Sequence, residues 1–147
     1  MMKWQIKRFN ELSPDELYQL LGLRSEVFVV EQNCVYQDID GKDPRAYHVI
    51  GESDGRINAY ARLFAPGDYF DEASIGRVVI NPKNRGRNIG HDLMKVAIEA
   101  VAVRFNQQHI RISAQLYLKK FYESHGFVQI GEVYPEDGIP HIRMEKV

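Results

Sequence analysis

The feature that most constrains this chain is a glycine-bearing turn between a β-branched segment and a long amphipathic one. Residues 75–80 read Ile-Gly-Arg-Val-Val-Ile, which is typical of a buried strand, and Asn81-Pro82 ends it. From Ile89 to Phe105 the apolar residues recur at helical spacing. The turn therefore leads into a helix N-terminus, where the first backbone N–H groups have no partner within the helix.

The composition of the turn suits a bound anion. Gly86 and Gly90 have no side chain to obstruct a ligand, and Asn88 tolerates the left-handed backbone that a tight turn needs. Free amides and the positive end of the helix dipole together favour a diphosphate. Lys83, Arg85 and Arg87 are expected to add positive charge around the edge of this anion site. Taken alone, the turn also fits an ordinary strand-to-helix loop with solvated basic residues.

Two other phosphate-binding motifs fit the turn poorly. A P-loop requires Gly-Lys-Ser/Thr, which the segment lacks. A dinucleotide-binding fingerprint follows the first strand of a parallel βαβ unit, whereas this turn follows several segments that read as antiparallel strands. The sequence therefore argues against both classes of nucleotide-binding protein.

The order of predicted elements indicates an α/β chain of the α+β type. Ser13-Pro14-Asp15-Glu16 is a strong helix start, Asp54-Gly55 is a hairpin turn, and Gly126 is a C-terminal helix cap. Helices are expected from Pro14 to about Phe28, over 89–105 and over 116–125, and strands over 4–8, 47–52, 56–64, 75–80, 110–114, 128–133 and 141–147. We expect one domain over 1–147, a mixed, mostly antiparallel sheet flanked by helices.

Composition excludes several classes of protein. The 147 residues carry a net charge of −1, which argues against nucleic-acid binding and against a polybasic membrane anchor. The single cysteine, Cys34, allows no disulfide within the chain. No apolar run resembles a signal peptide or a membrane span, so we expect a cytoplasmic protein with no membrane partner.

Two segments together resemble the GNAT superfamily of N-acetyltransferases. Arg85-Gly86-Arg87-Asn88-Ile89-Gly90, with Pro82 upstream, is similar to the family's acetyl-CoA motif, except that Asn88 replaces a glycine. Phe121-Tyr122 followed by Gly126-Phe127 is similar to a second family segment, and Gln115 stands where many members have asparagine. Two motifs in the right order are far more specific than either alone.

The resemblance implies a co-substrate, acetyl-CoA, and a set of residues that bind it. The strand would pair with the pantetheine arm, and an N–H near Val79 would stabilise the oxyanion. Tyr122 would protonate the departing thiolate as the catalytic acid, although half-buried packing is its structural alternative. The implied cofactor-binding residues are Val78, Val79, Ile80, Arg85, Gly86, Arg87, Asn88, Ile89, Gly90 and Gln115.

The acceptor side is less defined by the sequence. Segments 23–34 and 136–142 resemble the ElaA-like subgroup and, with 36–41 and 60–62 added, extend the resemblance over nearly the whole chain. The resemblance does not identify the amine acceptor, which could be a small molecule or a protein. An attacking ammonium must first lose a proton, to a side chain such as Glu31 or to a chain of waters. Candidates for amine binding or proton removal are Glu31, His48, Asp137 and His141, each of which also reads as surface charge, a loop contact or a hydrogen-bonded histidine.

Several alternatives stay open at this point. The fold could serve as a non-catalytic acyl-CoA-binding sensor or as an interaction module, and a homodimer is possible. Asp38, Asp40 and Asp43 lack the spacing of an EF-hand and read instead as a solvated turn. The histidines have no zinc-site spacing with Cys34, so no metal is expected.

Overall fold

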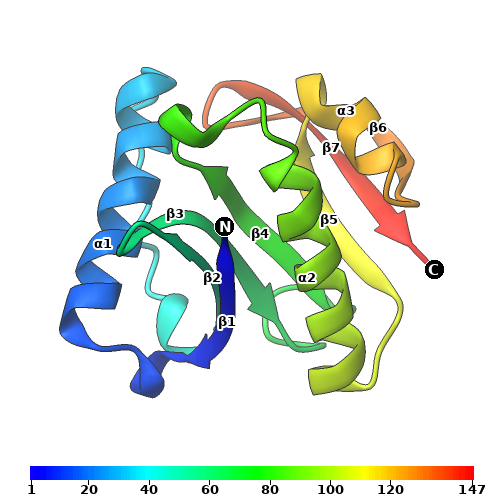
Figure 1. The fold of residues 1–147 in the computed structure, drawn as a ribbon. Helices are drawn as coiled ribbons and strands as arrows, with labels where there is room; N and C mark the ends of the chain where they lie inside the picture. Colours follow the sequence, from blue (N-terminus) through cyan, green and yellow to red (C-terminus); the bar gives the residue numbers. More distant parts are fainter.

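The computed structural model describes all residues from 1 to 147 and shows two antiparallel sheets (Figure 1). The first sheet has the order β1–β2–β3–β4, formed by Lys3–Arg8, Tyr47–Ser53, Arg56–Phe64 and Ser74–Ile80. The second has the order β5–β7–β6, formed by Ile110–Gln115, Ile139–Lys146 and Val128–Glu136. Every ladder in both sheets is antiparallel and helices flank the sheets, which confirms the predicted fold class. The one sheet expected from the sequence is divided in two, joined only by an isolated parallel bridge.

The helices follow the predicted order, with two differences in length. Helix α1 (Pro14–Arg24) continues without a break into a π-helical segment, Ser25–Glu31, and α2 spans Ile89–Phe105. The helix expected over 116–125 is shorter, because only α3 (Lys119–Glu123) is α-helical. Short 3₁₀ turns occupy Phe9–Glu11, Asp43–Arg45, Pro82–Asn84 and Leu116–Leu118. None of the helices combines the length and apolar character needed to cross a bilayer.

Local sequence signals account for the ends of these elements. The Ser13 hydroxyl accepts the Glu16 N–H at 3.0 Å, and the Glu16 carboxylate accepts the Ser13 N–H at 2.8 Å, which is the predicted capping box. Asp54 and Gly55 both have positive φ, as a tight hairpin turn requires. Gly126, with φ of +91°, ends the α3 region as predicted.

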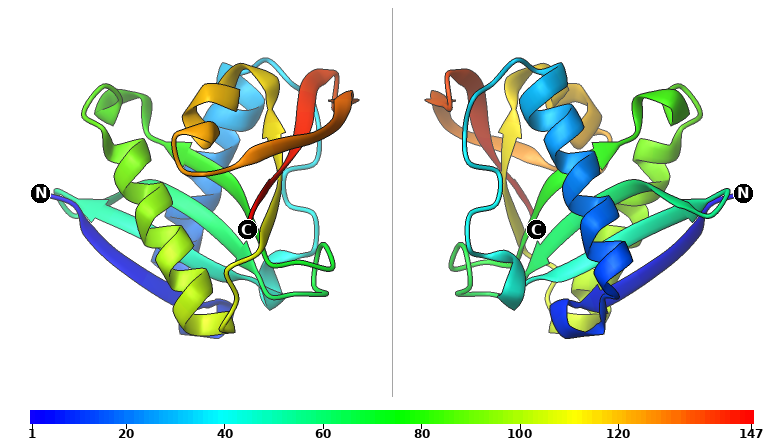
Figure 2. Two further views of the ribbon diagram at one scale, coloured as in Figure 1. Left: turned by 90° about the vertical axis from the view of Figure 1, so that its right-hand side faces the viewer. Right: turned by 90° about the vertical axis from the view of Figure 1, so that its left-hand side faces the viewer.

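The two long helices cover opposite faces of the first sheet, as the two views of Figure 2 show. Side chains alternate along β3, so that Ala59, Ala61 and Leu63 pack into the larger core with α2. Tyr60 points the other way, into a smaller core completed by Leu20 and Leu23 of α1 and by Val27 and Phe28 of the π-helical segment. Residues of β5 and β7 extend the larger core, so one apolar layer joins both sheets.

The sheets meet at only one end of β4 and β5. Ala73 and Ile110 form an isolated parallel bridge, and the Arg111 N–H donates to the Ala73 carbonyl at 2.9 Å. Beyond this point the two strands share no ladder, and they diverge towards Ile80 and Gln115 (Figure 1). The divergence leaves a wedge between the sheets, and the candidate site lies in it.

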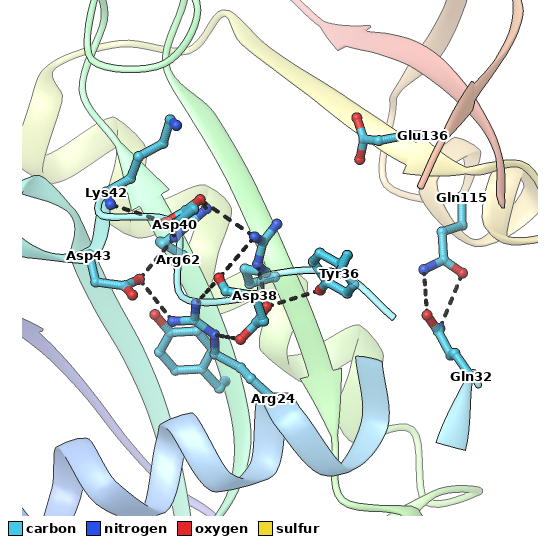
Figure 3. A network of polar contacts seen from close by, with 12 residues as sticks. Arg24, Gln32, Tyr36, Asp38, Asp40, Lys42, Asp43, Arg62, Gln115 and Glu136 are labelled. Atoms are coloured by element: carbon cyan, nitrogen blue, oxygen red, sulfur yellow. Dashed lines mark hydrogen bonds and ion pairs between the residues drawn. The ribbon is translucent and has the colours of Figure 1, made fainter. Parts of the chain in front are cut away.

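A buried ionic cluster, here called the Arg–Asp network, ties the 32–46 segment to the core (Figure 3). Arg24 bonds Asp38 at 2.9 Å and Asp43 at 2.8 Å, and Arg62 bonds Asp43 at 2.9 Å and Asp40 at 2.8 Å. Arg77 of β4 joins through Asp38 at 2.8 Å.

The solvated turn expected for these aspartates is therefore wrong. Asp40 does accept the Lys42 N–H, as an Asx turn would, but Asp38 and Asp43 are buried. Their partners Arg24 and Arg62 lie far away in the sequence, so local spacing could not reveal the pairing.

Replacing Asp43 is expected to destabilise the fold. Burial alone would raise the pKa of Asp43, but hydrogen bonds and charge from Arg24 and Arg62 outweigh it and lower that pKa. We expect Asp43→Ala to reduce the free energy of unfolding by roughly 3–5 kcal/mol at neutral pH, because two buried guanidinium groups lose a shared partner. Urea denaturation measures the loss, and exposed Asp71 provides the control variant Asp71→Ala.

The ion pairs of Asp43 also predict how the free energy of unfolding changes with pH. A carboxyl group with a lowered native pKa stabilises the fold above its unfolded pKa of about 4, and the contribution is lost as the pH falls through the native value. Wild type should therefore lose stability on acidification more steeply than Asp43→Ala. Parallel acid transitions in the two proteins would contradict this account.

Candidate functional site

The larger of two adjoining cavities lies along the turn that the sequence predicts to bind a diphosphate. Its volume is about 540 Å³, within the range of small-molecule sites. It runs from β4 across the turn to the start of α2 and is closed on the far side by the α3 region. Its lining includes Val78, Val79, Ile80, Arg85, Gly86, Asn88, Ile89, Gly90, Gln115, Phe121 and Tyr122.

The backbone of the turn opens the helix N-terminus towards this cavity. Gly86 and Asn88 both adopt left-handed conformations, with φ of +82° and +60°. Asn88 makes no side-chain cap to α2, and the first helical bond runs from the Asp92 N–H to the Asn88 carbonyl. The amides of the first turn are thus left for a ligand. Gly90 lies against the Phe121 ring, where a built Cβ would stand 3.5 Å from the ring edge.

An ion pair stands at the rim of the larger cavity. The Arg85 guanidinium donates to both oxygens of Glu31, at 2.7 Å each. These hydrogen bonds lower the pKa of Glu31, which makes it a weak proton acceptor. Since both side chains are well exposed, the pair contributes little to stability and can open for an anionic ligand.

The smaller cavity lies on the other side of the wedge and has a volume of about 100 Å³. One wall is the second sheet, where alternation brings Ser113 and Gln115 of β5 to the same face as His141 of β7. The opposite wall comes from β4 and the 32–36 segment. The Cys34 thiol donates to the Asp137 carbonyl at 3.2 Å, which fixes that segment against the β6–β7 turn.

The two cavities share a junction. Six residues line both of them: Phe28, Gln32, Val78, Gln115, Leu118 and Tyr122. The amides of Gln32 and Gln115 hydrogen-bond to each other at 3.3 Å across the wedge (Figure 3). The π-helical segment Ser25–Glu31 leads directly to Gln32, in keeping with the frequent occurrence of π-helical turns at functional sites.

A β-bulge changes the direction of β4 next to the junction. Tyr60 pairs with Val79 and Arg62 with Gly76, so Arg77 and Val78 together face Ala61 alone. Arg77 has φ of +50°, which is unusual for a residue other than glycine. Because Asp38 and Asp40 hold its guanidinium, the Arg–Asp network fixes this conformation of β4.

Tyr122 is the buried phenol of the junction. Burial, and then the neighbouring Tyr117, raise the pKa of Tyr122 well above its usual range, so it keeps its proton at neutral pH. Its ring packs edge-on against Phe121 and Phe127. Its hydroxyl makes no hydrogen bond within the chain, which leaves the O–H free for a group in the cavities.

Comparison with known proteins decides the family. Residues 10–147 match the model of the acetyltransferase (GNAT) domain. The chain belongs to the GNAT family. Protein ElaA of Escherichia coli strain K12 is 43% identical, over 99% of this chain and 97% of the relative. The crystal structure of Escherichia coli ElaA superimposes with a TM-score of 0.93, and an acyl-CoA N-acyltransferase from Pseudomonas aeruginosa gives 0.95 at 42% identity over 100% of both chains.

Most residues that the sequence singled out lie in the GNAT wedge. All predicted cofactor-binding residues except Arg87 line the larger cavity, while Arg87 is exposed beside it. Asp137 and His141 line the smaller cavity, whereas Glu31 lies on the larger one with Arg85.

His48 lies outside both cavities and is fully buried. Its ring nitrogens bond the Tyr60 hydroxyl at 2.7 Å and the Asp43 carbonyl at 3.0 Å, and burial lowers its pKa. It is a hydrogen-bonded histidine of the core, and we leave it out of the site.

Sequence reasoning missed several residues of the wedge, among them Gln32, Arg77, Ser113 and Glu136. Strand alternation from Gln115 could have found Ser113, two residues earlier on the same face. Glu136 directly precedes Asp137 in a segment already singled out. Arg77 and Gln32 depend on a bulge and a π-helical segment, which leave no clear sequence signal.

One cluster outside the GNAT wedge has the residue types of a metal site. Ligand atoms of Glu72, His109 and Glu145 lie within 4.8 Å of one another. The Arg111 Nε lies 3.7 Å from Glu72 and 3.8 Å from Glu145, so a positive charge of the chain already stands among these carboxylates. We assign no metal to this cluster.

Proposed function

We propose that this protein transfers an acetyl group from acetyl-CoA directly to the nitrogen of an amine. The observation that carries the proposal is the junction between two cavities of different chemistry. The larger, with a basic rim and free helix amides, suits the diphosphate and pantetheine of acetyl-CoA. The smaller suits an amine, and the acetyl carbonyl would lie between them at Val78 and Val79.

Direct transfer requires the two substrates to meet without an acyl-enzyme. The amine attacks the carbonyl carbon, the oxyanion forms against the bulged β4 backbone, and the C–S bond then breaks. Tyr122 donates its O–H to the sulfur as negative charge develops there. At the rim of the larger cavity, the exposed ion pair between Glu31 and Arg85 separates, and Arg85 then binds phosphate oxygens of the coenzyme in place of the carboxylate.

The proton of the attacking ammonium is best accepted by His141. Its Nδ1 lies 2.7 Å from the Ile139 carbonyl, which can only accept, so Nδ1 carries the hydrogen. In the neutral ring the lone pair is then on Nε2. His141 also pairs with Gln115 across β5 and β7, which brings its side chain next to the junction.

A direct test is an acetyl-CoA titration with detection of the released thiol over a panel of amines. We expect CoA binding by calorimetry and thiol release that depends on the amine. Binding without transfer to any amine would favour the non-catalytic sensor instead. No binding of the coenzyme would overturn the proposal.

Replacing Tyr122 tests its role at the sulfur. We expect Tyr122→Phe to lower kcat about 100-fold while the Kd of acetyl-CoA changes little, because the ring packing is kept and only the O–H is lost. Tyr18→Phe, at an exposed tyrosine of α1 that lines neither cavity, is the matched control. Unchanged turnover in Tyr122→Phe would remove the residue from the mechanism.

Replacing His141 tests proton removal. His141→Ala should lower kcat/KM for the amine about 100-fold at neutral pH, and the loss should shrink as the pH rises because more amine is already free of its proton. A pH series of initial rates measures both effects. His109→Ala, a histidine outside both cavities, is the control. A loss of equal size at every pH would show that His141 acts only through structure.

A further inference from the structure

We propose that the acceptor is an aliphatic amine that carries a second positive charge, and that Glu136 holds this second charge. The inference rests on the proposed function and concerns the same site. It comes from the polar groups of the smaller cavity, which are arranged for a cation.

Glu136 is held by a chain of hydrogen bonds that crosses all three strands of the second sheet. The Arg143 Nε donates to the Tyr134 hydroxyl at 3.1 Å, and the Ser113 hydroxyl donates to Glu136 Oε1 at 3.1 Å. Tyr134 and Ser113 are in hydrogen-bond contact. Because the Ser113 hydrogen is already used, the Tyr134 O–H must donate to Ser113. Every donor in the chain thus points towards Glu136, and its Oε2 is left for a ligand.

A ring nitrogen of His141 stands next to that oxygen. The His141 Nε2 lies 3.4 Å from Glu136 Oε2, and in the neutral ring it carries a lone pair rather than a hydrogen. The carboxylate-bearing residue Asp137 lines the same cavity. The lone pair of Nε2 and the carboxylate of Glu136 are then two separate acceptors, one for the reacting nitrogen and one for a second nitrogen of the same ligand.

Glu136 forms no ion pair with a lysine or arginine of the chain, and its one potential cationic neighbour is His141. Arg77 is the one lysine or arginine that lines the smaller cavity, and its guanidinium forms an ion pair with Asp38 at 2.8 Å and lies 3.4 Å from Asp40. Figure 3 shows Glu136 on the side of Gln115, away from the Arg–Asp network. A half-exposed carboxylate that pairs with no lysine or arginine is a binding group for a cationic ligand.

The nitrogen bound by Glu136 is better a second nitrogen than the reacting one. A carboxylate in contact with the reacting nitrogen would stabilise its ammonium form and oppose attack. Ser113, which donates a hydrogen bond to Glu136, lies two residues before Gln115 on the same face of β5. Along the strand, the two residues are about 6.6 Å apart. Two nitrogens separated by roughly this span belong to a short diaminoalkane.

The test compares acceptors with one carbon chain and different far ends. Diaminobutane, aminobutanol and aminobutyrate present a positive, a neutral and a negative group at the same distance from the reacting amine. We expect kcat/KM to fall in that order, with diaminobutane about 10-fold or more above aminobutanol, the factor expected of a hydrogen bond to a charged group. Equal values, or a preference for aminobutyrate, would overturn the proposal.

Glu136→Gln separates recognition of the charge from catalysis. The variant should bring kcat/KM for diaminobutane close to that for aminobutanol, while the value for aminobutanol changes little. Glu132→Gln, an exposed acid on the same strand, should leave the ratio as in wild type. A loss of equal size for both acceptors would show that Glu136 serves His141 or the fold instead.

A binding measurement keeps this inference separate from the proposed function. If no amine is acetylated, the proposed function fails, and calorimetry of diaminobutane with the CoA-bound protein still tests recognition. Binding to wild type that is lost in Glu136→Gln would support the cation site. An absence of diaminobutane binding to the CoA-bound wild type would overturn it.

Discussion

The site depends on the interruption of one strand pairing. β4 and β5 meet through the Ala73–Ile110 bridge and then diverge, because the β4 bulge and the twist of two separate ladders carry their ends apart. A continuous ladder would fill this space with backbone hydrogen bonds and leave no wedge. Both cavities, the junction and the free backbone of β4 follow from the divergence.

A wedge between two sheets needs support from outside the ladders, and two elements provide it. The larger core, built on α2, joins the sheets from one side. On the other side the Arg–Asp network links α1, the 32–46 segment and β4, and it ends on Arg77 at the bulge. Buried ion pairs of this kind add little net stability over apolar packing, so we infer that their value here is to fix one geometry of β4.

The fold was largely predictable because its signals are local. Neighbouring residues alone indicate three of its elements: the capping box at Ser13 begins a helix, Asp54-Gly55 forms a hairpin turn, and the periodicity of 89–105 predicts a helix. The lining of the larger cavity was predictable for the same reason, since one turn and one strand supply most of it.

The lining of the smaller cavity was harder to predict because it is assembled from distant segments. His48 and His141 look equally suitable in the sequence, yet one is enclosed by the core and the other faces a cavity. Asp38, Asp40 and Asp43 resemble a surface turn until the arginines of α1, β3 and β4 are placed beside them. Burial and pairing of this kind depend on the tertiary fold, and spacing along the chain does not encode them.

The charge of the wedge is divided in a way that suits two unlike substrates. Arg85 and the helix amides stand at the outer end of the larger cavity, and Glu136 and Asp137 stand in the smaller one. Under the proposed function, an anionic coenzyme and a cationic amine would each be favoured on one side of the junction and disfavoured on the other. Only uncharged groups line the shared junction, where the thioester and the neutral amine would meet. The net charge of −1 hides this division, because charges of opposite sign cancel in the sum while remaining separate in space.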